Sequence, residues 1–228
     1  MKTTSIVLAV AVLLLCSFVN LQKKKKIVFF GDSITWLSEK PQGFLTQMRS
    51  HLHKENVNDV ELVNAGVSGD KVYDLYLRQD DVLAQNPDAV VIWIGVNDVW
   101  HKQLLHTGTD ADKFERFYRA LIKKFTDRNI RVYLCTPAVI GEKPTGENAN
   151  DEELDKYSDI IRKIATDQKL TLIDLRQQFT AYVKSHNVSA VEKGILTADG
   201  VHLNEKGNAF VAQLFYDTLK QGSFAPQR

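Results

Sequence analysis

The sequence predicts an α/β protein with three layers, an α/β/α sandwich in which helices cover both faces of a five-stranded parallel sheet. Five short, apolar, β-prone segments alternate with longer segments whose apolar residues recur at helical spacing. Because parallel strands need right-handed crossover connections, each crossover lays a helix on one face of the sheet. No repeat or low-complexity linker divides the 228 residues, and 44% hydrophobic and 25% charged residues are typical of one soluble domain.

The first predicted strand, residues 27–30, ends in a glycine, an acid and a serine. Gly31 allows a sharp turn without a Cβ clash, and Ser33 then lies where open α/β sheets bind their ligands. Asp32 and Ser33 are also good helix caps, so taken alone they fit a purely structural role equally well. The pair becomes informative only together with groups elsewhere in the chain.

The next segments repeat the β-α pattern. A helix is expected over residues 43–55, a strand over 61–64, and a helix over 72–83 after a glycine-rich turn at 64–70. The backbone N–H groups of this turn are free to point at an anion. Ser68 is a rival nucleophile in the turn, but it lacks the G-x-S-x-G frame of a nucleophile elbow.

Residues 89–94 are the most apolar run outside the N-terminal segment and predict the central strand. Asn97 follows at the carboxyl end of this strand, where a side-chain amide can donate a hydrogen bond to a developing oxyanion. A simple Asx turn is the structural alternative. Trp100 and His101 come directly afterwards and are candidates to line a cleft.

The second half of the chain continues the alternation and contains one long polar loop. The expected strands cover residues 130–136 and 170–174, and the expected helices cover 109–128, 151–167, 177–186 and the segment after Asn204. Thr109 and Asp112 have capping-box spacing, and Asn204 is expected to cap the last helix. The polar loop over residues 137–150 is long for a connection, which is common in loops that contribute to binding sites.

Asp199 and His202 stand three residues apart near the end of the chain. A carboxylate at this spacing can reach the imidazole within one turn, so one loop can supply both groups. A serine, a histidine and an acid are the side chains that nucleophilic ester cleavage needs.

Four short blocks together resemble the SGNH (GDSL-type) hydrolase family. They are Gly31-Asp32-Ser33-Ile34-Thr35, Gly69, Gly95-Val96-Asn97-Asp98 and Asp199-Gly200-Val201-His202, in the family's order. The resemblance runs from Ile27 to about Lys220, and the family's usual leucine after the serine is Ile34, which has a similar apolar size. The resemblance implies a flavodoxin-like strand order 2-1-3-4-5, with the catalytic elements at the carboxyl edge of the sheet.

The resemblance also assigns the chemistry. Ser33 is expected to attack the ester carbonyl, His202 to take and return the proton, and Asp199 to hold the imidazole. The backbone N–H groups of Ser33 and Gly69 and the side-chain amide of Asn97 are expected to form the oxyanion hole. No cofactor and no metal are expected.

The predicted reaction is hydrolysis of a short acyl ester, above all an acetyl ester, on a carbohydrate or another polar alcohol. The chain has no long apolar insertion that could fold over an acyl tail. Asp32, Trp36, Trp100 and His101 are expected near the substrate, since aromatic faces suit the apolar face of a sugar ring, although core packing is the alternative for both tryptophans. A lysophospholipase or thioesterase with the same triad stays open, as does a catalytically silent sugar- or lipid-binding protein.

Residues 1–22 predict a signal peptide, because Met1-Lys2 is followed by an apolar stretch at 6–19 that is short for a membrane span. The cleavage site is untidy, so an uncleaved N-terminal anchor stays open. The hydrolase domain is expected over residues 23–228 and is expected to be exported, periplasmic or secreted, with no stable membrane span after processing.

Charge and cysteine content exclude several classes of partner and site. The 29 basic and 28 acidic residues leave a formal net charge of +1, which does not favour nucleic acid or an anionic surface. After loss of Cys16, only Cys135 would remain, so no intrachain disulfide can form, and a buried thiol is expected. Asn187-Val188-Ser189 matches a glycosylation acceptor, a pattern that also arises by chance. The sequence does not indicate an oligomeric state.

Overall fold

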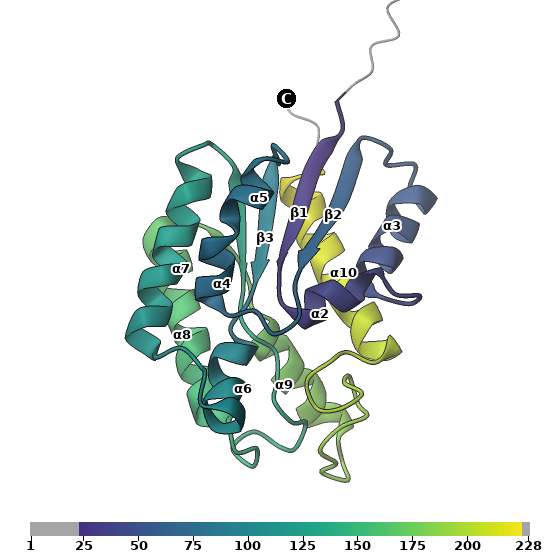
Figure 1. The fold of residues 1–228 in the computed structure, drawn as a ribbon. Helices are drawn as coiled ribbons and strands as arrows, with labels where there is room; N and C mark the ends of the chain where they lie inside the picture. Colours follow the sequence, from purple (N-terminus) through teal and green to yellow (C-terminus); the bar gives the residue numbers. More distant parts are fainter. Residues whose placement is uncertain (1–22, 225–228) are drawn as a thin grey trace, which may run out of the picture.

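A five-stranded parallel sheet forms the centre of the computed structural model, which describes residues 23–224 (Figure 1). Its strands are β1 (Lys25–Gly31), β2 (Val60–Gly66), β3 (Ala89–Trp93), β4 (Arg131–Cys135) and β5 (Thr171–Ile173). The order is β2-β1-β3-β4-β5 and every neighbouring pair is parallel, so the predicted topology is confirmed. The predicted signal peptide lies outside the described residues.

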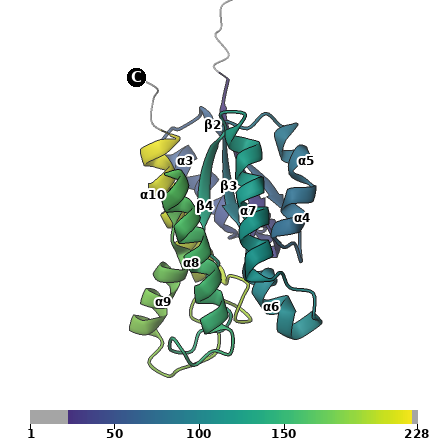
Figure 2. The same cartoon turned by 90° about the vertical axis from the view of Figure 1, so that its left-hand side faces the viewer.

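Helices cover both faces of this sheet (Figures 1 and 2). α3 (Phe44–Lys54) and α10 (Glu205–Gly222) pack together on one face, and α4 (Val72–Leu77), α5 (Gln79–Leu83), α7 (Ala111–Thr126) and α8 (Asp151–Gln168) cover the other. The remaining elements follow strands β1, β3 and β5. They are α2 (Ser33–Trp36) and η1 (Leu37–Glu39) after β1, α6 (Val96–Leu105) after β3, and α9 (Leu175–His186) after β5. The three-layer α/β/α sandwich is therefore confirmed.

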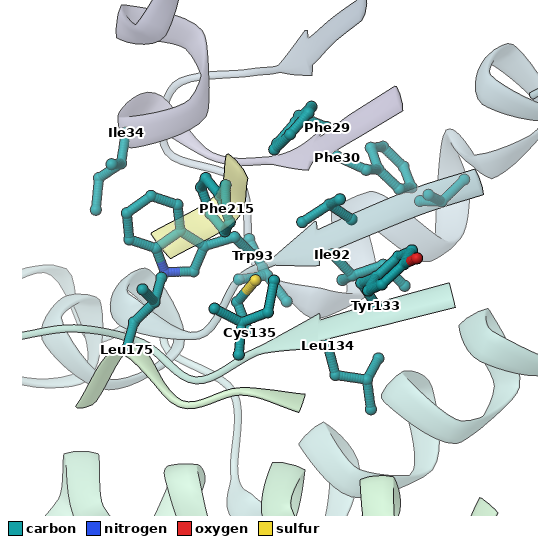
Figure 3. Close-up of a cluster of buried hydrophobic side chains, with 14 of the residues drawn as sticks. Phe29, Phe30, Ile34, Ile92, Trp93, Tyr133, Leu134, Cys135, Leu175 and Phe215 are labelled. Atoms are coloured by element: carbon teal, nitrogen blue, oxygen red, sulfur yellow. The ribbon is translucent and has the colours of Figure 1, made fainter. Parts of the chain in front are cut away.

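The core is densest where the central strand meets α3 and α10. β3 is buried along its whole length, as a strand with helices on both faces must be. The Trp93 ring lies 5.9 Å from Phe44 and 5.8 Å from Phe215, measured between ring centroids. Ile34, the neighbour of Ser33, belongs to the same buried cluster (Figure 3). The start of α2 is thus fixed to the core beneath it.

One predicted helix is divided in two. Instead of a single helix over residues 72–83, the chain leaves helical geometry at Arg78, between α4 and α5. The Arg78 side chain turns back to the sheet, where Nη2 donates to the Gly31 carbonyl at 3.0 Å and the guanidinium lies 4.5 Å from the Phe30 ring centroid. Because this is a tertiary contact, the apolar periodicity of the segment gave no sign of it.

Several helix starts agree with prediction, and two differ. Asn204 caps α10 as expected, with Oδ1 accepting from the Gly207 N–H at 2.9 Å. The helix predicted from Thr109 begins at Ala111 without a capping box, and Thr109 is buried with its N–H on the Asp98 carbonyl. α9 begins at Leu175, two residues earlier than predicted, and α6 is a helix that the sequence did not predict.

Cys135 is buried at the end of β4, as predicted, and burial raises the pKa of its thiol well above the ordinary value. Across residues 23–224, none of the helices combines the length and the apolar character that crossing a membrane requires.

Candidate active site

Ser33 is the first residue of α2, directly beyond the carboxyl end of β1. Asp32 is the cap of this helix, with its buried carboxylate accepting from the Ile34 N–H at 2.9 Å. Gly31 is required at the turn, because a Cβ there would lie 2.4 Å from the Trp93 carbonyl oxygen. The structure thus gives Asp32 a capping role, while its predicted contact with substrate stays a prediction.

The three predicted triad residues are brought together at the carboxyl edge of the sheet. Ser33 Oγ lies 2.9 Å from His202 Nε2, and His202 Nδ1 lies 2.7 Å from Asp199 Oδ2. The other carboxylate oxygen of Asp199 accepts from the backbone N–H groups of Val201 at 2.9 Å and His202 at 2.7 Å. One carboxylate therefore holds both the imidazole and the backbone that carries it.

The hydrogen bonds to Asp199 decide its charge. Partial burial disfavours its charged form, but the bonds from the His202 ring and from the His202 and Val201 N–H groups outweigh burial and hold the Asp199 pKa below the ordinary value. The ionised carboxylate accepts the Nδ1 proton of His202, which leaves Nε2 with a free lone pair toward the Ser33 hydroxyl. This is the tautomer that a general base needs.

The turn at Gly69 supplies a backbone donor beside the serine. Gly69 has a φ of +86°, a conformation that favours glycine, and no heavy atom lies within 4 Å of the place where a Cβ would stand. Among the described residues, neither the Ser33 nor the Gly69 N–H has a hydrogen-bond acceptor. Ser33 N–H is one of the free donors at the start of a helix. Both groups are available to a ligand.

Asn97 lies in the first turn of α6 and is buried. Its Nδ2 donates one hydrogen bond to the Asp70 carbonyl at 3.0 Å, which ties α6 to the turn at Gly69. A primary amide nitrogen carries two hydrogens, so one remains for a developing oxyanion. The position of the amide is compatible with the predicted role, and the segment is the first turn of α6 rather than the Asx turn that was the structural alternative.

Two side chains that the sequence did not single out support the Gly69 turn. Arg78 Nε donates to Asp70 Oδ2 at 2.6 Å while its Nη2 bonds the end of β1, so the guanidinium joins the turn to the strand that carries Ser33. Asp98 accepts the Val72 N–H at 3.2 Å on each carboxylate oxygen. No periodic pattern reveals such contacts, since they link separate loops.

Burial strongly affects two acids of this region. Desolvation raises the pKa of Asp32 to about 7 and the pKa of Asp98 to about 7, against hydrogen bonds that lower both. Asp70 and Asp98 add to the effect on Asp32, so the three acids compete for ionisation.

The remaining predicted residues lie around this centre. Trp36 ends α2 one turn from Ser33 and is 54% exposed, so the core-packing alternative is wrong for it. Trp100 packs half-buried against the core. His101 lies one turn after Asn97, and burial, followed by the charge of Lys71, lowers its pKa. Contact of any of them with substrate stays a prediction.

The rival sites are weaker. Ser68 is exposed, and within residues 23–224 its hydroxyl bonds no imidazole. The same part of the chain contains no group of three or more histidine, cysteine, aspartate or glutamate side chains able to hold a metal ion.

A serine, an imidazole and a carboxylate in hydrogen-bonded sequence at the carboxyl edge of a parallel sheet define the class, a serine-type carboxylic ester hydrolase. The model of the GDSL-like Lipase/Acylhydrolase family matches residues 29–210, and the chain belongs to this family. The matched range contains the carboxyl end of β1, the turn at Gly69, the start of α6 and the Asp199–His202 turn.

Three relatives show how closely the fold is shared. The solved structure of an acetyl xylan esterase, AlAXEase, is 52% identical, covers 85% of this chain and 99% of its own, and has a TM-score of 0.84. An acetylxylan esterase from Geobacillus stearothermophilus is 27% identical over an alignment of 210 positions, which covers 84% of this chain and 92% of the relative. LAE5, an alpha/beta hydrolase from the metagenome of Lake Arreo, Spain, is 26% identical with a TM-score of 0.74 and covers 90% of this chain and 99% of its own.

Proposed function

We propose that this protein is an esterase that removes acetyl groups from acetylated carbohydrates, acetylated xylan among them, through an acyl-enzyme on Ser33. The observation that carries the proposal is the 2.9 Å contact between Ser33 Oγ and His202 Nε2, with Asp199 on the far side of the ring. The acetylxylan esterases of similar fold support the acyl group and the carbohydrate.

In the acylation step, Ser33 Oγ attacks the acetyl carbonyl carbon and its proton passes to His202 Nε2. The negative charge that develops on the carbonyl oxygen accepts hydrogen bonds from the Ser33 and Gly69 N–H groups and from Asn97 Nδ2. Asp199 stabilises the imidazolium. The imidazolium then donates its proton to the departing sugar oxygen, which leaves an acetyl ester on Ser33.

In the second half of the cycle, a water molecule enters the place that the sugar has left. His202 takes a proton from this water as the oxygen attacks the acetyl carbonyl, and the same donors again hold the oxyanion. Collapse of the intermediate returns the proton to Ser33 Oγ and releases acetate. The mechanism needs no group beyond the side chains and backbone donors of the described site.

A small acyl group fits the surroundings of Ser33 better than a long one. The loop over residues 137–150 is polar and bonds to the segment over residues 187–204. The exposed aromatic one turn from the nucleophile, Trp36, suits a sugar ring. The lysophospholipase and thioesterase alternatives are not favoured, because the similar proteins named above that carry a substrate name are acetylxylan esterases.

The test is a series of nitrophenyl esters of increasing acyl length, followed by acetylated xylo-oligosaccharides. We expect kcat/KM to be highest for acetyl and to fall as the chain lengthens. Each buried CH₂ contributes about 0.8 kcal/mol only where a pocket receives it, so a preference for about eight carbons or more would contradict the proposal. The Ser33→Ala variant controls for hydrolysis by other groups.

We also propose that the protein is exported. The basic start and apolar stretch within residues 1–22 support this, although they lie outside the described structure. N-terminal sequencing of the protein from cell fractions and culture fluid of its host tests the proposal. A cytoplasmic protein that keeps residues 1–22 would contradict it.

A further inference from the structure

Glu142 is a fully buried acid in the polar loop between β4 and α8. Its carboxylate accepts hydrogen bonds from three consecutive backbone N–H groups: Oε2 from Ile195 at 2.8 Å, and Oε1 from Leu196 at 2.6 Å and Thr197 at 2.8 Å. A carboxylate is an acceptor only, so it matches three converging donors without leaving a donor unpaired.

The three residues that Glu142 holds lead directly into the turn that carries Asp199 and His202. Thr197 Oγ1 accepts from the Gly200 N–H at 3.1 Å, and the Ala198 N–H donates to the His202 carbonyl at 2.8 Å. An antiparallel bridge between Thr197 and Leu203 closes the base of the turn. Residues 197–203, here called the catalytic turn, are therefore held together by their own hydrogen bonds, and Glu142 holds the backbone where the chain enters this turn.

The backbone around Glu142 contacts the same region at further points. The Gly141 N–H donates to the Gly200 carbonyl at 2.8 Å, inside the catalytic turn, and the Glu142 N–H donates to the Glu192 carbonyl at 2.9 Å. Asn187 Nδ2 donates to the carbonyls of Glu142 and Val191. Asn187, the asparagine of the matched glycosylation pattern, is buried, and its amide has a structural role in the folded chain.

The loop that carries Glu142 is in turn anchored to the core. The buried Arg176 donates to Asp151 at 2.8 Å, to Asp155 at 2.6 Å and to the Ala138 carbonyl at 3.3 Å. These bonds fix both ends of the loop over residues 137–150. Hydrogen bonds thus anchor the loop that carries Glu142 to the core, and Glu142 in turn bonds the segment that enters the catalytic turn.

We infer that Glu142 is a positioning residue, which holds the catalytic turn so that His202 Nε2 stays within hydrogen-bond distance of Ser33 Oγ. The inference rests on the proposed function for its kinetic consequence. Glutamine has the same shape, but it must direct an NH₂ group toward one of the three N–H donors, which shifts the segment over residues 195–197. A displacement of about 1 Å at a catalytic group costs on the order of 10²-fold in rate.

The experiment compares Glu142→Gln with Asp174→Asn. Asp174 is a matched control, because its carboxylate, like that of Glu142, accepts a hydrogen bond from a backbone N–H, that of Gln177. Asp174 also bonds Arg162, and it lies outside the catalytic turn. We expect Glu142→Gln to lower kcat about 10- to 100-fold with KM changed less than about twofold. We expect Asp174→Asn to lower the Tm while leaving kcat within about twofold of the wild type.

A folded Glu142→Gln protein with wild-type kcat would overturn the inference. It would also be overturned if Glu142→Gln and Asp174→Asn lost kcat in the same proportion to their loss of Tm. If Glu142→Gln does not fold, Glu142→Asp keeps the carboxylate on a shorter side chain and is expected to lower kcat by about three- to tenfold at unchanged KM. An unchanged kcat in that folded variant would equally overturn the inference.

Proton NMR separates this inference from the proposed function. The Nδ1 proton of His202, held 2.7 Å from Asp199 between the heavy atoms, should give a low-field resonance in the wild type. We expect Glu142→Gln to broaden or shift it and Asp174→Asn to leave it unchanged. Wild-type protein that turns over no acetyl ester would contradict the proposed function alone, whereas an unchanged resonance in folded Glu142→Gln would contradict the role of Glu142.

Discussion

The Ser33 hydroxyl oxygen lies 2.9 Å from His202 Nε2, although 169 residues separate the two in the chain. β1 delivers the serine, and the turn before α10 delivers the histidine. The starts of α3 and α10 are joined by a hydrogen bond from the Phe44 N–H to Asn208 Oδ1 at 2.9 Å. The packing of these two helices on one face of the sheet therefore sets the distance between nucleophile and base.

Ser33→Ala is expected to lower kcat by roughly 10⁴- to 10⁶-fold while the Tm stays near that of the wild type. Within residues 23–224 the Ser33 side chain bonds only His202, so its loss removes chemistry and little stability. Nitrophenyl acetate hydrolysis, thermal melting and labelling by a fluorophosphonate probe measure this. Near-wild-type turnover in Ser33→Ala, together with loss of turnover in Ser68→Ala, would move the nucleophile to Ser68.

Asn97→Ala is expected to lower kcat by roughly 10²- to 10³-fold, the usual loss for one oxyanion donor, with a small change in KM. The variant also loses the bond from Nδ2 to the Asp70 carbonyl, so a modest fall in stability of about 1 kcal/mol accompanies it. Steady-state kinetics and urea unfolding separate the two effects. A change in KM alone would make Asn97 a substrate-binding residue.

The value of kcat/KM is expected to rise between about pH 5 and 8, because the imidazole must be neutral to accept the serine proton. The lowered pKa of Asp199 keeps its carboxylate ionised throughout this range, so it adds no second step. Asp199→Asn should lower kcat by roughly 10²- to 10⁴-fold. The half-exposed position of Asp199 favours the lower end of that range. A kcat/KM that falls as the pH rises through this range would contradict this assignment.

Trp36→Ala is expected to raise KM for acetylated xylo-oligosaccharides about three- to tenfold and to leave nitrophenyl acetate hydrolysis unchanged, since only the larger substrate reaches the exposed ring. Leu77→Ala is the control, because Leu77 is an exposed apolar side chain that belongs to α4. Equal effects of the two variants on the oligosaccharide would remove Trp36 from the substrate site.

The difference in free energy of unfolding between the Asp98→Asn variant and the wild type is expected to shift in favour of the variant as pH rises. The folded protein holds the pKa of Asp98 at about 7, above the ordinary value of 3.8, so between these values the native state binds a proton that the unfolded chain has lost. Wild-type stability therefore falls as pH rises toward 7, by at most about 4 kcal/mol from this group. Urea unfolding of both proteins at pH 5 and pH 8 tests this, and an equal difference at both pH values would contradict it.

The sequence by itself determined the elements whose signals are local. The apolar runs of β1 and β3 and the N-cap of α10 were predicted where they occur, because burial on both faces and capping are written in consecutive residues. The pairing of Asp199 with His202 was predictable for the same reason, since three residues of one turn bring the two side chains together.

The tertiary structure alone decided which distant loops support the site. Arg78 lies where the predicted helix is interrupted, and its side chain joins the Gly69 turn to β1. Glu142 binds a segment more than 50 residues away. No periodicity or motif reports such contacts, because they depend on the crossovers that bring separate loops to one edge of the sheet. The reacting groups could thus be predicted from local chemistry, whereas the side chains that hold them in place follow from the packing of the whole chain.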